Sequence, residues 1–232
     1  MSEKTAAAVL AAGTGSRFEG ELPKQFVTLG GRPVIDYSVR TFSAVPAIDF
    51  LYVVVAEEYR EYAERLREAC GWKVTRILIG GADRSGSTLA ALRAAEQDGA
   101  DRLLLHDAAR PLVTEHTILS VCEALEQVPA ATAAVPATDT IAVSDGVRRL
   151  CYTPDRQTLW HVQTPQGFSV GLLRRAYERK EQPALAAATD DCGLVRSCFP
   201  EVPIALADGS RQAMKLTYPE DLYLLETLLR IH

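Results

Sequence analysis

Short apolar runs alternate with amphipathic stretches through the first half of the chain, and this alternation constrains the fold more than any other feature. Residues 6–10 and 50–55 are almost continuously apolar, as buried strands are. Between them, Ile35, Val39 and Phe42 fall on one helical face. Strands that alternate with helices predict a mainly parallel sheet with helices on both faces. The expected fold class is therefore α/β.

Length and composition favour one compact unit. The chain has 232 residues, of which 47% are hydrophobic, so we expect a single domain over residues 1–232. There is no apolar run that could span a bilayer and no signal-peptide segment before the first strand, which predicts a cytoplasmic protein. The net charge of −5 argues against nucleic-acid and membrane-surface partners. Five cysteines without a C-x-x-C pair predict reduced thiols.

A glycine-rich loop follows the first strand. It reads Leu10-Ala11-Ala12-Gly13-Thr14-Gly15-Ser16-Arg17, and Pro23-Lys24-Gln25 comes soon after. Small residues let backbone amides approach an anion closely, and Arg17 and Lys24 add positive charge. The segment therefore predicts a clamp for a triphosphate.

Three kinds of phosphate-binding loop could follow a strand in this way, and their spacing distinguishes them. A P-loop needs Lys and a hydroxyl residue directly after its last glycine, whereas Lys24 is followed by Gln25. The dinucleotide fingerprint needs a third glycine where Phe18 stands. The remaining pattern, L-x-A-G-x-G-x-R followed by P-K, resembles the signature of the sugar nucleotidyltransferases. This resemblance implies that a nucleoside triphosphate binds along the loop.

Two later strands end in residues suited to ligands, which in such sheets bind beyond the carboxyl ends of the strands. The strand ending at Ile79 opens into residues 80–88, Gly-Gly-Ala-Asp-Arg-Ser-Gly-Ser-Thr. This is a second anion or nucleoside contact, or a turn in which Ser85 or Ser87 caps the next helix. The strand ending at His106 continues into Asp107-Ala108-Ala109-Arg110-Pro111, with a carboxylate and a guanidinium at the rim of the cleft. We expect His106 itself to be structural.

The middle of the chain predicts a hairpin. Residues 140–144 and 147–151 flank Asp145-Gly146, a pair typical of two-residue hairpin turns. An isolated hairpin is only marginally stable in water. We therefore expect residues 137–160 to form a projecting arm that packs on another subunit and gives a homodimer. The alternative is that the hairpin lies across its own sheet.

Taken in order, these segments and those that follow resemble one family, the 2-C-methyl-D-erythritol 4-phosphate cytidylyltransferases. Besides the loops above, the resemblance rests on these residues: Asp155-Arg156, Leu159-Trp160, Gln163-Thr164-Pro165-Gln166, Thr189-Asp190-Asp191 and Lys215-Leu216-Thr217-x-Pro219-Glu220-Asp221-Leu222. It implies a Rossmann-like nucleotidyltransferase fold. It also implies Mg²⁺-dependent transfer of CMP from CTP to 2-C-methyl-D-erythritol 4-phosphate, with release of pyrophosphate, in the non-mevalonate isoprenoid pathway.

The resemblance also implies roles for individual residues. The catalytic set is Arg17, Lys24, Arg156 and Lys215. The CTP-binding set is Ala11, Ala12, Gly13, Thr14, Gly15, Gly81, Asp83, Arg84 and Ser87. The set that holds the sugar phosphate is Asp107, Arg110, Thr140, Arg156, Thr164, Thr189 and Lys215. In this family the arm comes from the partner subunit, which implies that Thr140 and Arg156 complete the neighbour's site; whether they act in their own subunit or in the neighbour's is left open.

Three questions stay open at this point. The pentitol-phosphate cytidylyltransferases share several of these motifs, so ribitol 5-phosphate is the alternative acceptor, although Asp155-Arg156 and Leu159-Trp160 favour methylerythritol phosphate. A non-catalytic CTP-binding regulatory protein is the alternative of another class, and retention of every assigned basic residue argues against it. Mg²⁺ usually binds substrate phosphates with few protein ligands, so Asp190 and Asp191 are left as possible ligands without assignment.

Overall fold

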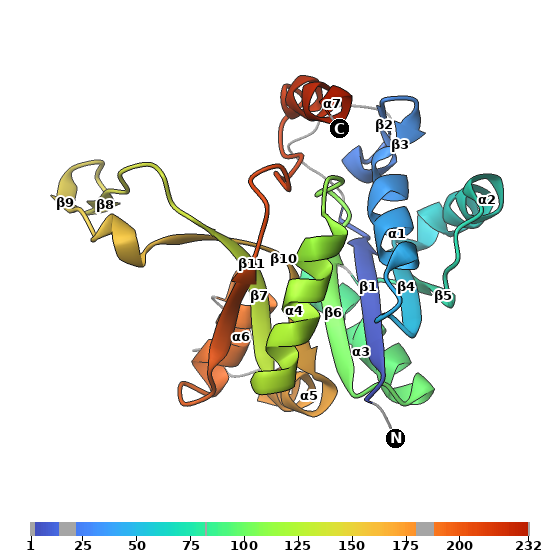
Figure 1. Ribbon diagram of the computed structural model, residues 1–232, viewed down its shortest axis with the longest axis horizontal. Coiled ribbons are helices and arrows are strands. Elements are labelled where there is room, and N and C mark those ends of the chain that lie inside the picture. The colour runs from blue at the N-terminus through green and yellow to red at the C-terminus, as the bar shows by residue number, and fades with distance from the viewer. Residues whose placement is uncertain (1–2, 14–21, 82, 180–187, 232) are drawn as a thin grey trace.

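The computed structural model describes residues 3–13, 22–81, 83–179 and 188–231. Its main feature is a seven-stranded sheet in the order β11-β7-β10-β6-β1-β4-β5 (Figure 1). The strands are β1 Thr5–Ala11, β4 Phe50–Val55, β5 Arg76–Ile79, β6 Arg102–Asp107, β7 Ala130–Pro136, β10 Trp160–Ser169 and β11 Ile204–Asp208. All neighbours pair in parallel except β10, which is antiparallel to β6 and β7. The predicted α/β fold with a mostly parallel sheet is confirmed.

Helices cover both faces of the sheet. They are α1 Val34–Ala44, α2 Arg60–Cys70, α3 Arg84–Asp98, α4 Glu115–Gln127, α5 Val170–Arg179 and α6 Asp191–Cys198, whereas α7 Asp221–Arg230 lies above the edge of the sheet (Figure 1). Successive residues of a strand point to opposite faces. Ala7 and Val9 of β1 accordingly pack with α1, α2 and α4, whereas Ala6 and Ala8 pack with α3, α5 and α6. No described helix combines the length and the apolar character that a bilayer crossing demands.

A smaller apolar cluster fixes the segments above the sheet edge. Leu29, Val34, Ala109, Leu216 and Leu225 are buried together. They join the loop after β6 to α7 and to the short ladder of β2 Thr28–Leu29 and β3 Arg32–Pro33. This packing anchors the backbone on which the polar side chains of that edge are carried.

A short 3-10 helix, η1 Lys24–Phe26, lies just before β2. Its Phe26 is buried, and the ring packs against those of Tyr59 and Tyr62, with centroids 5.3 and 5.1 Å away. Tyr59 ends a second such turn, η2 Glu57–Tyr59. The aromatic contacts hold η1, and with it Lys24, at the edge of the sheet.

The arm projects from the body of the molecule, as predicted, and does not lie across its own sheet (Figure 1). It carries β8 Val143–Ser144, β9 Leu150–Tyr152 and the 3-10 helix η3 Arg156–Thr158. The prediction of a two-residue turn was wrong. The carboxylate of Asp145 accepts the N–H groups of Val147 and Arg149, and the N–H of Asp145 itself bonds the carbonyl of Arg149. Side-chain bonding thus stabilises a longer loop than the Asp-Gly pair alone indicates.

Candidate active site

The carboxyl ends of β1, β5 and β6 lie at one edge of the sheet, because the strands from β6 to β5 are parallel. Ala108, directly after β6, donates its backbone N–H to the carbonyl of Leu10 in β1 at 3.0 Å. The loop after β5 reaches the same place, since a Cβ added at Gly80 would lie 2.6 Å from the Cβ of Ala12. The three strand ends singled out in the sequence therefore meet, where sheets of this kind bind ligands.

The loop after β1 is held by a side chain to which the sequence pattern gave no role. Gln25, buried in η1, donates its amide N–H groups to the carbonyls of Ala11 at 2.6 Å and Gly13 at 3.0 Å. Gly13 is exposed, and a Cβ added there would meet none of the described residues within 4 Å. Three further predicted residues of this loop lie outside the described residues: Thr14, Gly15 and Arg17.

The loop after β5 is a tight turn into α3. Asp83 caps this helix by accepting the N–H of Gly86 at 2.7 Å, so the cap is Asp83 and not Ser85 or Ser87. Ser87 is buried, and its hydroxyl donates to the carbonyl of Asp83 at 3.1 Å. A Cβ added at Gly81 would lie 2.7 Å from the Cα of Gly86, which makes these two glycines a packing requirement. The turn leaves Gly81 and Asp83 exposed.

Asp107, at the end of β6, lies between two cations. The Lys215 ammonium is 2.7 Å from one carboxylate oxygen, and the Arg84 guanidinium is 3.4 Å from the other. Burial by itself raises the pKa of Asp107, but Lys215 and Arg84 outweigh burial and hold that pKa well below its usual range. Asp107 is therefore a fixed anion that can accept hydrogen bonds and does not supply a proton.

His106 lies behind Asp107 and is completely buried. Burial lowers its pKa from 6.5 to about 4, which keeps the ring neutral. Its Nδ1 lies 2.9 Å from the hydroxyl of Thr164, and its Nε2 lies 3.2 Å from both the Ser38 hydroxyl and the Arg110 carbonyl. Because the Arg110 carbonyl can only accept, the neutral ring carries its proton on Nε2, and the Thr164 hydroxyl donates to Nδ1 while its oxygen accepts the N–H of Asp107 at 3.1 Å. These contacts agree with the structural role predicted for His106.

Three predicted cationic residues come together above this edge. Lys24 donates from Nζ to the carbonyl of Leu216 at 2.7 Å, next to Lys215. The N–H of Leu216 bonds the carbonyl of Ala109 at 2.8 Å, next to Arg110. Arg110 donates from one terminal nitrogen to a backbone carbonyl, while its buried Nε has no partner in the described part of the chain. Hydrogen bonds to the backbone of Leu216 and Ala109 thus hold the segments that carry these three cationic residues together.

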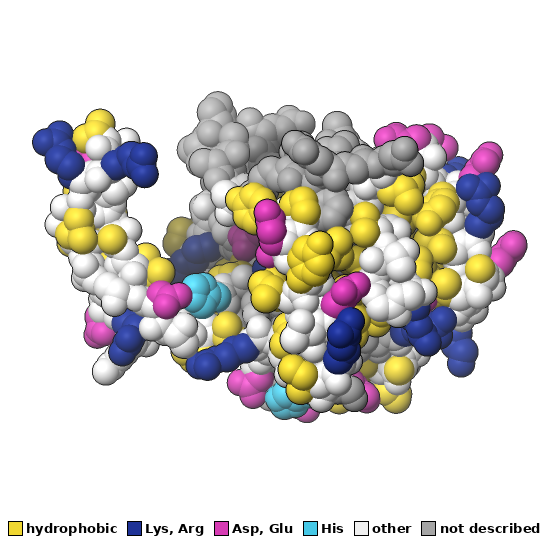
Figure 2. Space-filling model, turned by 90° about the horizontal axis from the view of Figure 1, so that it is seen from above, with side chains coloured by type: hydrophobic (Ala, Val, Ile, Leu, Met, Phe, Trp, Pro, Cys, Tyr) yellow, Lys and Arg dark blue, Asp and Glu magenta, His cyan; other side chains and the backbone are white. Residues whose placement is uncertain are grey.

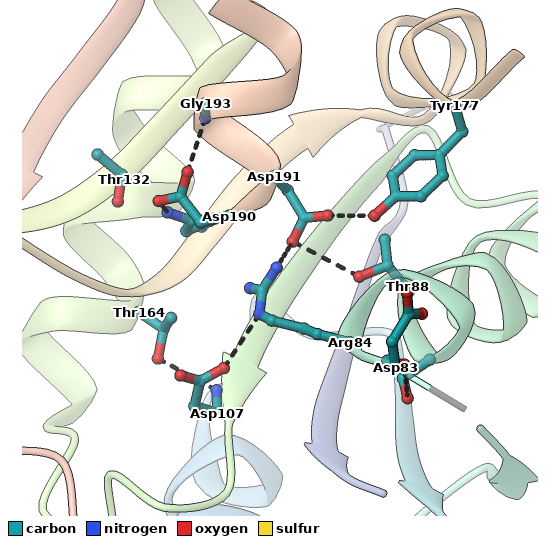
Figure 3. Close-up of polar contacts among 12 residues, drawn as sticks. Asp83, Arg84, Thr88, Asp107, Thr132, Thr164, Tyr177, Asp190, Asp191 and Gly193 are labelled. Carbon is teal, nitrogen blue, oxygen red and sulfur yellow. Dashed lines mark hydrogen bonds and ion pairs between the residues drawn. The ribbon is translucent and has the colours of Figure 1, made fainter. Parts of the chain in front are cut away.

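Arg84 lies between Asp107 and Asp191, the first residue of α6 (Figure 3). Asp191 also accepts the hydroxyl of Tyr177 at 2.6 Å. Asp190 caps α6 by accepting the N–H of Gly193 at 2.7 Å. Both carboxylates left open as metal ligands therefore have protein donors. Within the described ranges, no three His, Cys, Asp or Glu side chains are grouped to hold a metal ion.

The remaining predicted residues lie apart from this cluster or at its border. Thr189 is exposed and, with Arg84, helps to line a small pocket. Thr140 and Arg156 are exposed on the projecting arm (Figure 1), where Arg156 donates to the carbonyl of Thr138 at 3.3 Å. One chain by itself does not bring these two arm residues to the cluster.

Comparisons with known proteins place the chain in a family. The family model of 2-C-methyl-D-erythritol 4-phosphate cytidylyltransferase matches residues 5–231. The chain belongs to this family. A curated member from Thermobifida fusca is 43% identical over 98% of this chain and 94% of that protein. Another from Lachnospira eligens is 37% identical over 97% of this chain and 98% of that protein.

Solved structures of the family agree. The 4-diphosphocytidyl-2C-methyl-D-erythritol synthase from Anaerococcus prevotii superimposes with a TM-score of 0.86 at 27% identity, over 98% of this chain and 96% of that one. The 2-C-methyl-D-erythritol 4-phosphate cytidylyltransferase from Thermus thermophilus gives a TM-score of 0.74 at 30% identity, over 98% and 99%. The predictions of this family and of an enzyme are confirmed. The matches favour this cytidylyltransferase over the ribitol phosphate and non-catalytic alternatives.

Proposed function

We propose that this chain transfers CMP from CTP to the 4-phosphate of 2-C-methyl-D-erythritol 4-phosphate, releasing pyrophosphate, and that the cluster at the ends of β1, β5 and β6 is where it does so. One observation carries the assignment to this cluster. Lys24, Arg110 and Lys215 converge beside an open glycine loop, and the anion among them, Asp107, is fixed. Two polyanions can be brought together only where such cations gather.

The chemistry needs alignment and charge, and it does not need a general base. The attacking oxygen belongs to a phosphate monoester, which is already an anion, and it displaces pyrophosphate in line at the α-phosphorus. Lys24 and Arg17 stabilise the charge that develops on the α-phosphoryl oxygens and the leaving group. The neutral, buried ring of His106 has no part in proton transfer and instead orients Thr164.

The two substrates occupy neighbouring parts of the edge. The backbone of residues 11–15 and of Gly81 faces CTP, with Asp83, Arg84 and Ser87 beside it. Arg110 and Lys215 bind the acceptor phosphate, for which the planar guanidinium is suited to bond two oxygens. Asp107 accepts hydrogen bonds from acceptor hydroxyls, and Thr164 and Thr189 border the same space. The buried Nε of Arg110 has no partner among the described residues, so part of the hydrogen-bonding capacity of this guanidinium is unused there.

Mg²⁺ arrives with the triphosphate in this proposal. Both oxygens of Asp107 have cationic partners, and Asp190 and Asp191 have protein donors. These carboxylates do not fit a metal cage held by the protein. Magnesium commonly binds substrate phosphates with few protein ligands. Its contribution is to neutralise charge on the phosphates.

The arm supplies the residues that one subunit lacks. Its large apolar side chains are exposed, with Val147, Leu150 and Tyr152 at 64, 68 and 59%. A hairpin of this kind gains stability by packing on another surface. We infer a homodimer in which Thr140 and Arg156 reach the neighbour's acceptor site. The five cysteines are all free, which supports action in the reducing cytoplasm.

Pyrophosphate release tests the activity. Purified chain is given CTP and Mg²⁺ with either 2-C-methyl-D-erythritol 4-phosphate or ribitol 5-phosphate, and a third reaction omits Mg²⁺. We expect release only with the methylerythritol phosphate and only with the metal. Lys24→Ala should lose about a hundredfold or more in kcat, while Lys73→Ala, an exposed lysine, should keep wild-type turnover. Release with ribitol phosphate alone would move the assignment to the other acceptor.

A further inference from the structure

Arg84 bridges two carboxylates that belong to different parts of the fold. It is the first residue of α3, and its guanidinium contacts Asp107 at the end of β6 and Asp191 at the start of α6 (Figure 3). The Asp191 side chain is 1% exposed and the Arg84 side chain 28%. Arg84 therefore lies behind Asp107, on the side toward α5 and α6.

The anchor of this bridge is rigid. Asp191 accepts the Tyr177 hydroxyl at 2.6 Å on one oxygen. Its other oxygen takes Arg84, with the Thr88 hydroxyl at 3.5 Å. A buried carboxylate that lost its guanidinium partner would be left uncompensated, which is costly. Asp191 and Tyr177 therefore hold the guanidinium at one position.

Lys215, the other ion-pair partner of Asp107, is less firmly held than Arg84. Lys215 is exposed, with 41% of its side chain accessible, and has a flexible stem. In the proposed function Lys215 binds the acceptor phosphate. When its ammonium turns to that phosphate, the ion pair with Arg84 is the one of these two that remains on Asp107.

We propose that Arg84 is a positioning residue, anchored by Asp191 and Tyr177, that holds Asp107 in place for the acceptor. The inference rests on the proposed function, because Asp107 is there the acceptor of hydroxyl hydrogen bonds. It assigns to Arg84 a role through Asp107, where the family resemblance implied direct contact with CTP. The two roles differ in which substrate responds when Arg84 is removed.

The chain contains a matched control for this arrangement. At the other end of α3, Arg76 pairs with Asp98, and Asp98 accepts the Tyr52 hydroxyl at 2.8 Å. This group has the same three residue types as Arg84, Asp191 and Tyr177. Among the described residues, Arg76 has no second carboxylate partner equivalent to Asp107. Replacing Arg76 therefore measures how much stability is lost when an arginine with a purely structural role is removed.

The experiment compares Arg84→Gln with Arg76→Gln. In each variant, kcat and both KM values are measured with CTP and 2-C-methyl-D-erythritol 4-phosphate, and Tm is recorded. For Arg84→Gln we expect kcat/KM for the acceptor to fall about a hundredfold, as small misplacements of reacting groups do, with little change in KM for CTP. Arg76→Gln should leave both KM values near wild type even if its Tm falls.

A double variant shows whether Arg84 acts through Asp107. If it does, Arg84→Gln/Asp107→Asn loses no more acceptor kcat/KM than Asp107→Asn alone, within about twofold. Tyr177→Phe, compared with Tyr52→Phe, repeats the test with a milder change to the anchor. Its acceptor kcat/KM should also fall.

The outcomes separate the two proposals. Activity of the wild-type chain with methylerythritol phosphate establishes the proposed function whatever Arg84 does. A rise in KM for CTP in Arg84→Gln, with acceptor kinetics unchanged, would overturn the positioning role and support direct nucleotide contact. Equal behaviour of Arg84→Gln and Arg76→Gln would reduce Arg84 to a structural residue.

Discussion

At the scale of single residues, buried polar side chains behind the site hold in place the groups that border it. His106 is neutral because it is buried, and its two ring nitrogens are both engaged, one by the hydroxyl of Thr164. Gln25 holds two carbonyls of the loop after β1. Neither residue needs to touch a substrate, yet each fixes a group that does so in the proposed function.

The neutral state of His106 predicts a specific dependence of stability on pH. Its pKa is about 4 in the folded chain against 6.5 normally, so the unfolded chain binds the proton first. The stabilising contribution is therefore complete above pH 6.5 and is lost as the pH falls toward 4. The two values differ by about 2.5 units, which corresponds to about 3 kcal/mol.

Urea unfolding of wild type and His106→Gln between pH 4 and 7 measures this contribution. We expect the difference in free energy of unfolding to shrink as the pH falls through that window. His116→Gln, at an exposed histidine, is the control for the substitution itself. Parallel curves for wild type and His106→Gln would show that His106 is not the titrating group.

At the scale of elements, the junction between β5 and α3 is built by contact between glycines. Gly81 and Gly86 approach so closely that a Cβ at either would lie 2.7 Å from the Cα of the other. The turn lets Asp83 cap α3 and begins the helix at Arg84. The same junction thus sets both the proposed nucleotide contact and the bridge to Asp107.

Gly81→Ala should destabilise this junction because backbone must move to admit the methyl group. We expect a loss of about 1–3 kcal/mol in the free energy of unfolding, as overpacking typically costs. Gly171→Ala in α5 is the matched control, since its Cβ would meet nothing within 4 Å, and it should cause no loss. Chemical denaturation measures both, and equal stability of the two variants would contradict the packing argument.

At the scale of the whole molecule, the arm extends from the body of the structure (Figure 1), and Figure 2 shows hydrophobic side chains exposed along it. Thr140 and Arg156 belong to this arm. Its exposed apolar side chains are suited to an interface. If the neighbour's arm completes each site, neither subunit has a complete site by itself. Activity then depends on association, and a single chain would be inactive however well it folds.

Mixed dimers test this dependence. Lys24→Ala and Arg156→Ala are each expected to be nearly inactive, but a mixed dimer contains one site with both residues intact if Arg156 acts in the partner. After random exchange of subunits we expect about a quarter of wild-type kcat. A mixture of Lys24→Ala and Lys215→Ala should gain nothing, because both residues serve the same subunit's site.

Sedimentation of the mixture gives the second readout. It should show dimers for every variant. A failure to recover activity could then not be explained by a failure of the subunits to associate. Mixed dimers that are present but as inactive as either parent would show that Arg156 serves its own subunit. Monomers throughout would contradict the homodimer itself.

Individual residues show which features of the structure could be predicted from the sequence. The strand ends, the α/β class and the projecting arm followed from local patterns, and so did the placing of Asp107 at the rim of the predicted cleft. Lys215 was predicted as a site residue only through the family resemblance. The pairing of those two with each other did not follow. Gln25 was passed over although it stands directly after Lys24, a position from which a side chain can return to the preceding loop. The prediction of the turn at Asp145 was wrong because the Asp145 carboxylate accepts the backbone N–H groups of Val147 and Arg149, which stabilises a longer loop.

Local patterns in the sequence were enough to predict the alternation of strands and helices and the glycine loops, because periodicity and turn chemistry act between near neighbours in the chain. The family followed from the resemblance of motifs taken in order. The position of Arg84 between Asp107 and Asp191, the latter 107 positions away, came from the folding of distant segments onto one another. No local rule selects among the many carboxylates that one arginine could meet. Burial removes water from the charges that the fold brings together, and this is what makes the pairing specific.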